Sequence, residues 1–329
     1  MAFLIFSLNL TSFLILWNEF FNYREFIDPL FKSKNSQNVI GRIHPKEETK
    51  KILIFSGHHD SALQFNLLTH LKIGYPIIIF LGLVVMMIWL VSSLVIVLLT
   101  LVNLFFYDNF FLFTLILFIL GVPAFIGLFF FVSFGEKANK VPGAVDNLSA
   151  VAIVLAIGKF LKENKDYIPK HTEIRLISFG CEEAGLRGAY RYAKNHFDEL
   201  NEFNAECVNM DGIQSKDNVS IIDFEPSTRT KHSDIVVEKI THAASSSGIR
   251  VKSLALGGSG TLEKVIGQIT GGTDATAFSK AGIKAASITA MDLKKMLKLY
   301  HQHTDTLDKI ESESLESVLK ICITYILNE

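Results

Sequence analysis

The chain has 329 residues, enough for one large domain or two small ones, and 49% of them are hydrophobic. Its 32 basic residues nearly balance its 33 acidic ones, which argues against a nucleic-acid surface or a polyanionic partner. The cysteines form no CxxC pair, which argues against a disulfide framework and a thiolate zinc site; they are Cys181, Cys207 and Cys322. Any metal must therefore be held by His, Asp and Glu.

An apolar segment over residues 1–17 opens the chain. No basic residue precedes Arg24 and no small-residue cleavage site follows, so the segment lacks the features of a cleaved secretory signal. It is short for a membrane span and carries polar side chains such as Ser7 and Asn9. A third span, a truncated element and a buried strand are all compatible with this composition.

Two long uncharged runs follow the mixed stretch over residues 18–72. The first covers 35 residues between Lys72 and Asp108, and the second covers 27 residues between Asp108 and Glu136. Since about 20 apolar residues cross a bilayer, each run is long enough to span it. Residues 73–135 are therefore predicted to form a transmembrane helical hairpin, which makes the chain a multi-pass integral membrane protein with the lipid bilayer as a partner.

The remaining segments, residues 18–72 and 136–329, alternate short apolar runs typical of strands with helical stretches. The strand-like runs are Asn38–Ile43, Ile52–Ser56, Ile174–Phe179, Cys207–Met210 and Ala285–Thr289. The helical stretches are Leu148–Leu161, Gly185–His196, Ser233–Ala244 and Ser312–Leu327. This alternation predicts an α/β fold with a mixed, largely parallel central sheet flanked by helices and interrupted by the hairpin. In such sheets the site lies beyond the carboxyl ends of the strands.

Potential metal ligands and acids follow four of the predicted strands and open one of the predicted helices. These candidates are His58, Asp146, Glu182, Glu183, Asp211 and His301. Each residue type is commonly structural when it stands alone. Together, carboxylates and imidazoles are the ligands expected of a hydrolytic zinc pair, and a second Glu beside a ligand Glu offers a general base.

Five short motifs carry these residues, in the order Gly57–Ser61, Gly143–Asn147, Cys181–Leu186, Asn209–Gly212 and Tyr300–Thr306. In this order the motifs resemble the zinc exopeptidase family that includes bacterial leucyl aminopeptidases, glutamate carboxypeptidase and glutaminyl cyclase. The resemblance covers residues 37–61 and the chain from residue 141 onwards, and it treats the middle as an insertion. It implies a zinc exopeptidase-like fold.

The resemblance implies a site for two Zn²⁺ ions, with other divalent metals such as Co²⁺ or Mn²⁺ as possible substitutes. His58, Asp146 and Asp211 would hold one ion. Asp146, Glu183 and His301 would hold the other, so that Asp146 bridges the pair.

Each histidine ligand has a neighbour that offers an alternative. His59 is the alternative to His58, and His303 is the alternative to His301. In the family the first histidine ligand stands two residues before the Asp of the first motif, here Asp60, and the last one stands four residues before the Asp of the last motif, here Asp305. This spacing favours His58 and His301.

The same resemblance implies roles for side chains that hold no metal. Glu182 would act as general base, taking a proton from a metal-bridging water and returning it to the leaving amine. Asp60 would receive the free ring N–H of His58 and fix its tautomer. Tyr300 would help to stabilise the oxyanion, and Asp274 would lie near the centre without binding metal.

The implied function is that of a membrane-anchored two-zinc exopeptidase acting on peptides, with aminopeptidase as the commoner activity of the family. Three alternatives stay open: a carboxypeptidase, a glutaminyl cyclase-like acyltransferase with a single zinc, and a catalytically silent receptor-like homologue. Retention of all five ligand positions favours the two-metal peptidase. A metal analysis separates a peptidase, a cyclase and a receptor-like protein, because they bind two, one and no zinc ions.

The hairpin, with predicted spans Ile73–Phe106 and Phe110–Phe134, lies between two of the predicted ligands. The segments before and after it must reach the same site, so the number of spans between them must be even. Basic residues near span ends tend to stay in the cytoplasm, and those that flank the hairpin are Lys72, Lys137 and Lys140. The catalytic domain, residues 18–72 and 136–329, is therefore predicted to face the cytoplasm.

Overall fold

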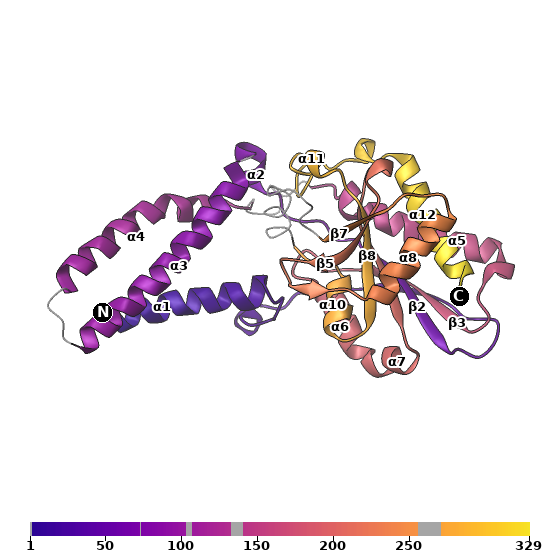
Figure 1. The fold of residues 1–329 in the computed structure, drawn as a ribbon, viewed down its shortest axis with the longest axis horizontal. Helices are drawn as coiled ribbons and strands as arrows, with labels where there is room; N and C mark the ends of the chain where they lie inside the picture. The colour runs from indigo at the N-terminus through magenta and orange to yellow at the C-terminus, as the bar shows by residue number, and fades with distance from the viewer. Residues whose placement is uncertain (1, 73, 103–106, 133–140, 256–270) are drawn as a thin grey trace. The chain divides into compact units, whose positions relative to one another are not determined.

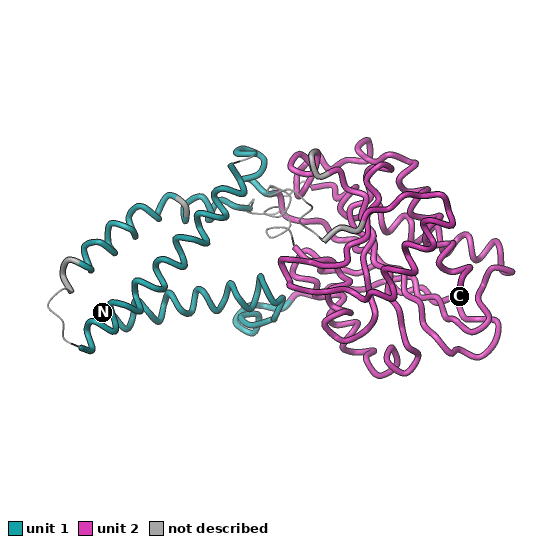
Figure 2. Tube along the Cα trace, viewed as in Figure 1, with its two compact units in different colours: residues 1–33, 65–139 teal, residues 34–64, 140–329 magenta. Residues whose placement is uncertain are grey.

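The computed structural model describes residues 2–72, 74–102, 107–132, 141–255 and 271–329. They belong to two compact units (Figure 2). The helical unit comprises Met1–Ser33 and Phe65–Asn139, and the α/β unit comprises Lys34–Gln64 and Lys140–Glu329. The helical unit therefore consists of an opening segment and an insertion into the chain of the α/β unit.

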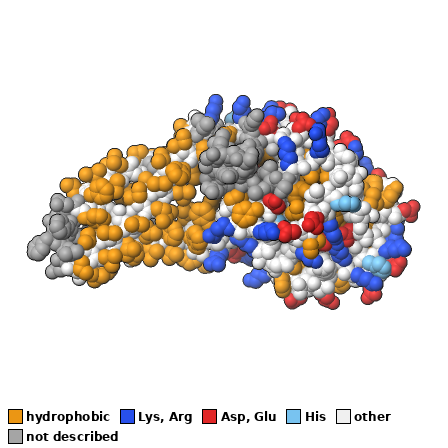
Figure 3. Space-filling model, viewed as in Figure 1, with side chains coloured by type: hydrophobic (Ala, Val, Ile, Leu, Met, Phe, Trp, Pro, Cys, Tyr) orange, Lys and Arg blue, Asp and Glu red, His pale blue; other side chains and the backbone are white. Residues whose placement is uncertain are grey.

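Three long apolar helices make up most of the helical unit (Figure 1). Its elements are α1 (Ala2–Ile15), the π-helical turn η1 (Leu16–Phe20), the 3-10 turn η2 (Asp28–Leu30), α2 (Asn66–Leu71), α3 (Gly74–Leu101) and α4 (Tyr107–Phe129). Helix α3 lies within the first uncharged run, whereas α4 includes Asp108 and most of the second run; parts of the predicted spans, residues 73, 103–106 and 133–134, lie outside the described residues. Hydrophobic side chains cover most of the visible surface of these helices (Figure 3).

Close contacts at glycines hold α3 and α4 together. A Cβ added at Gly121 would lie 2.4 Å from Cγ1 of Val85 and 2.9 Å from the ring of Trp89. The Trp89 ring stacks on Phe118 and Phe125, with centroids 4.5 Å apart in both pairs. Small residues at such a contact let the helix axes approach closely, as they do in helix pairs within lipid.

An eight-stranded mixed sheet forms the centre of the α/β unit, in the order β1-β3-β2-β4-β8-β5-β6, with β7 paired to β5. The strands are β1 (Val39–Ile43), β2 (Lys51–His58), β3 (Thr172–Phe179), β4 (Glu206–Ile213), β5 (Ser220–Glu225), β6 (Thr230–Lys231), β7 (Lys252–Ala255) and β8 (Lys284–Ala290). Pairing is parallel from β3 through β2 and β4 to β8, whereas β1 and β5 run antiparallel to β3 and β8. The predicted mixed α/β sheet is confirmed; β5, β6 and β7 were not predicted.

Helices cover both faces of this sheet, because alternate residues of a strand point to opposite faces. In β2, Leu53 and Phe55 belong to the core under α5, α8 and α12, whereas Ile52 and Ile54 belong to the core under α6, α7 and α10. These helices are α5 (Ser149–Glu163), α6 (Arg187–Asn195), α7 (Phe197–Glu202), α8 (Asp234–Ser246), α10 (Ala275–Lys280) and α12 (Ser312–Leu327). The short elements are η3 (Ala144–Leu148), η4 (Lys165–Tyr167), η5 (Lys216–Asn218), α11 (Leu293–Met296) and η6 (Leu307–Lys309).

Among the described residues, four helical segments are long and apolar enough to cross a membrane. They are Ala2–Phe20, Gly74–Leu101, Phe110–Phe129 and Ala144–Glu163. The last contains α5, whose residues Ile153, Ile157 and Leu161 lie on one helical face and are buried against the sheet. That segment is thus a core helix of the α/β unit, and the other three belong to the helical unit.

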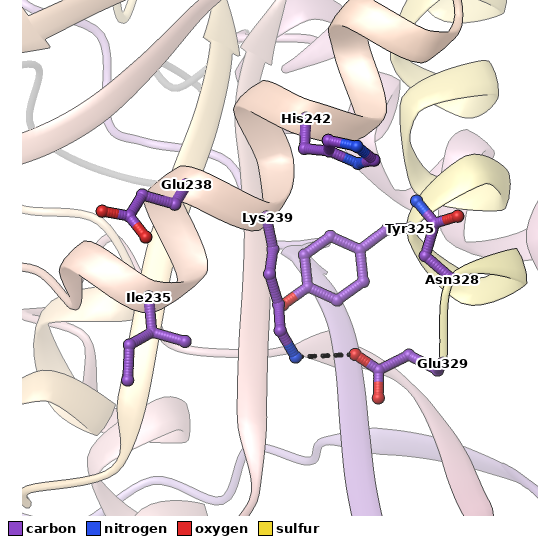
Figure 4. Close-up of a pocket in the computed structure, with 7 residues that line it drawn as sticks. All are labelled: Ile235, Glu238, Lys239, His242, Tyr325, Asn328 and Glu329. Carbon is purple, nitrogen blue, oxygen red and sulfur yellow. Dashed lines mark hydrogen bonds and ion pairs between the residues drawn. The ribbon is translucent and has the colours of Figure 1, made fainter.

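A buried carboxylate at the amino end of β4 joins the sheet to two helices. Glu206 accepts hydrogen bonds from Tyr325 Oη at 2.7 Å, Lys51 Nζ at 2.8 Å and Lys239 Nζ at 2.9 Å. Burial acts to raise the pKa of Glu206, but these donors outweigh it and hold the pKa below its ordinary value. Lys239 also pairs with Glu329 at 2.8 Å in a surface pocket between α8 and α12 (Figure 4).

We expect Glu206→Gln to lower the free energy of unfolding at neutral pH by about 2 kcal/mol, because hydrogen bonds to charged groups contribute roughly that much. The folded-state pKa of Glu206 lies below its unfolded-state value, so its stabilisation is present above about pH 4.3 and is lost as the pH falls through the folded-state pKa. The difference in melting temperature between wild type and variant should therefore shrink as the pH is lowered.

Thermal unfolding of detergent-solubilised protein at neutral and acidic pH measures this difference. The exposed Glu238 on α8, changed to Gln, is the matched control and should leave the melting temperature unchanged at both pH values. A difference in melting temperature between wild type and Glu206→Gln that is the same at both pH values would contradict the lowered pKa of Glu206.

Candidate metal centre

The candidate ligands converge at the carboxyl-terminal edge of the parallel strands. They come from β2 (His58), the turn η3 (Asp146), the loop after β3 (Glu182 and Glu183), β4 (Asp211) and the loop after β8 (His301). Neighbouring parallel strands end at the same edge of a sheet, so residues far apart in the sequence become neighbours there.

The carboxylate of Asp146 stands between two imidazoles. Its Oδ1 lies 3.2 Å from Nε2 of His58, and its Oδ2 lies 3.4 Å from Nε2 of His301. Two groups of possible metal ligands share this carboxylate, each with ligand atoms within 4.8 Å of one another: His58, Asp146 and Asp211, and Asp146, Glu183 and His301. These are the two sets that the family resemblance implied.

The two consecutive glutamates point at different histidines. Glu183 Oε2 lies 3.3 Å from Nε2 of His301, and Glu182 Oε2 lies 3.7 Å from Nε2 of His58. The carboxylate of Asp60 accepts both of their backbone N–H groups, each at 3.1 Å. The nearer acceptor for Nδ1 of His58 is the backbone oxygen of Asp60 at 3.1 Å, with the carboxylate at 3.6 Å. Asp60 therefore fixes the glutamate pair as well as the histidine.

The alternative histidines have other surroundings. Nδ1 of His59 lies 2.9 Å from Oγ of Ser178 on β3, and the side chain of His303 is exposed. Neither belongs to a group of possible metal ligands among the described residues. His58 and His301 are the pair that faces Asp146.

Negative charge accumulates at this cluster. Burial, reinforced by the charges of neighbouring carboxylates, raises the pKa of Glu182, Glu183 and Asp211 well above their ordinary values. Burial acts on Asp146 in the same direction, but hydrogen bonds with the two histidines outweigh it and lower its pKa. Divalent cations would supply the counter-charge, and imidazole nitrogens with carboxylate oxygens are the donors that zinc accepts. The residues present thus fit a zinc site.

Asp305 holds the turn that carries Asp146. Its Oδ1 accepts the backbone N–H of Val145 at 2.7 Å, and its Oδ2 accepts that of Asp146 at 3.1 Å. Asn147 adds a second link, because its Nδ2 donates to the backbone oxygen of Met210 at 3.0 Å. Sequence reasoning used Asp305 only to count spacing, and its place in the last motif was the one signal available.

A row of buried polar side chains crosses the strands next to the ligands. Ser56 Oγ donates to Oδ1 of Asn209 at 2.8 Å, Asn209 Nδ2 donates to Oγ of Ser287 at 3.3 Å, and Ser287 Oγ lies 2.6 Å from Oγ1 of Thr273. Ser56 precedes His58 by two residues, so both point to the same face of β2. The row fixes β2, β4 and β8 relative to one another beside the site.

The two remaining predicted residues are Tyr300 and Asp274. The ring of Tyr300 stacks on that of His301, with centroids 3.8 Å apart. Asp274 is fully buried just before α10, and burial raises its pKa to about 7. The carboxylate of Glu225 holds the adjoining Thr273, accepting its backbone N–H at 3.1 Å and its hydroxyl at 2.7 Å.

Residues 132–326 match the model of peptidase family M28. Aminopeptidase YwaD of Bacillus subtilis is 30% identical over 179 residues, which cover 53% of this chain and 35% of that protein. The zinc aminopeptidase BSAP from Bacillus subtilis matches with a TM-score of 0.52 at 20% identity, over 89% of this chain and 50% of its own. A Zn-dependent exopeptidase from Parabacteroides distasonis gives a TM-score of 0.51 at 16% identity, over 89% of this chain and 77% of its own. The structural likeness shows a shared fold, although the chain spans only half the length of BSAP.

Asp305→Asn is expected to weaken zinc binding by roughly 10- to 100-fold, the usual effect of removing a group that orients a metal ligand. An amide offers only one acceptor oxygen, so one of the two backbone N–H groups of the Asp146 turn loses its partner. Asp308→Asn, an exposed change three residues further on, is the matched control. Competition with a chelating dye measures the affinity, and equal affinities in the two variants would show that Asp305 does not position the turn.

Proposed function

The chain belongs to peptidase family M28, and we propose that it is a membrane-anchored two-zinc exopeptidase with aminopeptidase activity. The observation that carries the proposal is the position of Asp146 between two ligand groups, because a carboxylate shared in this way can join the ions of a hydrolytic metal pair. Relatives named aminopeptidases favour this activity. The proposed substrates are peptides with a free amino terminus.

In this proposal each zinc ion has three protein ligands. His58, Asp146 and Asp211 hold one ion, and Asp146, Glu183 and His301 hold the other, with Co²⁺ or Mn²⁺ as possible substitutes. Zinc held there would polarise the scissile carbonyl and make water more acidic.

Glu182 is the proposed general base. Its carboxylate lies beside His58 and outside the two groups that share Asp146. From this position it can take a proton from the attacking water and return that proton to the leaving amine. Asp60 positions this side chain through its backbone, and Tyr300 is the proposed donor to the oxyanion that forms on the substrate carbonyl.

We expect Glu182→Gln to reduce turnover of peptide amides by at least about 100-fold, because it removes a proton acceptor. Bound zinc should stay near the wild-type level, because Glu182 is not a proposed ligand. Glu183→Gln is the matched control, an identical change one residue away, and it should lose both turnover and zinc. Turnover and elemental analysis are measured on the same detergent-purified protein.

The opposite behaviour of the two variants would exchange the roles of Glu182 and Glu183. Two zinc ions per wild-type chain support the peptidase; one ion points to the cyclase-like alternative, and none points to a receptor-like protein. Peptides blocked at the amino or the carboxyl terminus separate an aminopeptidase from a carboxypeptidase.

The proposed membrane anchor is the hairpin of α3 and α4, residues 73–135, inserted into a catalytic domain of residues 18–72 and 136–329. The helices have 28 and 23 residues and carry one charged residue between them, Asp108. Their exposed apolar side chains and glycine contacts suit a lipid environment. The flanking basic residues favour a catalytic domain in the cytoplasm; they are Lys72, Lys137 and Lys140.

Protease protection in sealed inverted vesicles tests this anchor with one tag beside Asp108 and another at the end of the chain. We expect the protease to remove the terminal tag and to leave the tag beside Asp108 intact, because two spans return the chain to its starting side. Equal protection of both tags would rule out the hairpin. The reversed pattern would overturn only the cytoplasmic orientation.

A further inference from the structure

Large apolar side chains of α1 are exposed. With the turn η1, the helix covers 19 residues, Ala2–Phe20. At about 1.5 Å per residue this length nearly matches the roughly 30 Å hydrocarbon core of a bilayer. Phe3, Leu4 and Leu8 are 55%, 60% and 61% exposed. Exposed apolar side chains of this kind are satisfied by apolar surroundings, and lipid acyl chains supply them.

Helix α1 also packs against α3. Ala2, at the start of α1, shares a buried cluster with Ile96 near the end of α3, and Phe110 near the start of α4 packs against that cluster. Further along, Asn9 reaches Trp89, which precedes Ile96 on α3. Helix α1 therefore runs antiparallel to α3 and begins where α3 ends and α4 begins (Figure 1).

Two polar side chains of the segment Ala2–Phe20, Asn9 and Glu19, have hydrogen-bond partners. The side-chain amide of Asn9 donates to the backbone oxygen of Trp89 at 3.4 Å, which joins the two helices. The only charged residue of Ala2–Phe20 is Glu19, which lies in the last turn and accepts the backbone N–H of Ile27 at 2.7 Å. Since an unsatisfied polar group in lipid costs several kcal/mol, these contacts remove an obstacle to insertion.

Basic residues follow this segment closely. Residues 2–20 contain no Lys or Arg, whereas Arg24, Lys32 and Lys34 follow them within the distance over which basic residues influence orientation. Residues 102–109, which follow α3 in the sequence and include the first residues of α4, also contain no basic residue. In both the opening segment and the hairpin, the basic residues thus lie at the ends from which the chain continues into the α/β unit.

We propose that α1 is a third transmembrane helix, packed in the bilayer against the hairpin, and this inference rests on the membrane anchor proposed above. A single span before residue 34 and two spans after residue 64 put the start of α1 and the α3–α4 connection on one side of the membrane. Both segments of the α/β unit, with the metal ligands, are on the other side.

The test adds a third tag before residue 1 to the full chain in sealed inverted vesicles. The tags before residue 1 and in the α3–α4 connection are expected to share one side, and the tag after residue 329 is expected on the other. A first tag that shares the side of the last tag, with the connection tag opposite, would overturn the third span and leave the hairpin intact. All three tags on one side would overturn the hairpin and, with it, this inference.

Cysteine labelling gives a second measurement without a tag on α1. A cysteine added before Ala2 and Lys32→Cys place thiols before and after the segment, and the unmodified chain is the background control. A membrane-impermeant maleimide should label the two variants from opposite sides of sealed vesicles. Labelling of both from the same side would overturn the proposal, even if the tagged protein had given the expected pattern.

Discussion

The carboxylate of Asp146, held between two imidazoles, is the interaction on which the metal centre depends. One oxygen faces His58 at 3.2 Å and the other faces His301 at 3.4 Å, so a single side chain fixes the spacing of both ligand groups. A shared carboxylate must itself be held in place, and Asp305 does this through the backbone of the turn. Burial and neighbouring carboxylates raise the pKa of Glu183 and Asp211, and cations held there would favour their ionised forms.

Close packing behind the ligands makes this geometry rigid. A Cβ added at Gly57 would lie 2.5 Å from Cβ of Ala150, so β2 and α5 touch directly beside His58 and just after the turn of Asp146. The same helix buries Ile153 and Ile157 in the core. Because protein interiors are close-packed, a change of volume at this contact would move one ligand relative to the other.

The two units differ in where their apolar side chains lie. The helical insertion nevertheless leaves the sheet of the α/β unit uninterrupted. In the α/β unit, alternating residues fill two cores, whereas the long helices of the other unit expose theirs. The ends of the insertion meet: Phe65 and Val132 form a bridge, and the N–H of Asn66 donates to the backbone oxygen of Phe131 at 2.9 Å. The insertion thus returns the chain to the point where it left, so β2 can pair with β3 and β4 from the later segment.

The sequence by itself determined the mixed α/β class, five of the eight strands and four main helices of the α/β unit, because periodicity is a local property; the resemblance of its motifs to a known family implied the residues that now surround Asp146. The sequence did not determine β5, β6 and β7, the hydrogen bonds that Asp305 accepts from the Asp146 turn, or those that Asp60 accepts from two backbone amides. Those bonds join groups more than 120 residues apart and depend on the path of the chain and the direction of a side chain, which residue type does not encode. The opening segment shows the same limit: its composition suited a span or a strand, and only its packing against α3, through Ala2 and Asn9, gave it a helical partner.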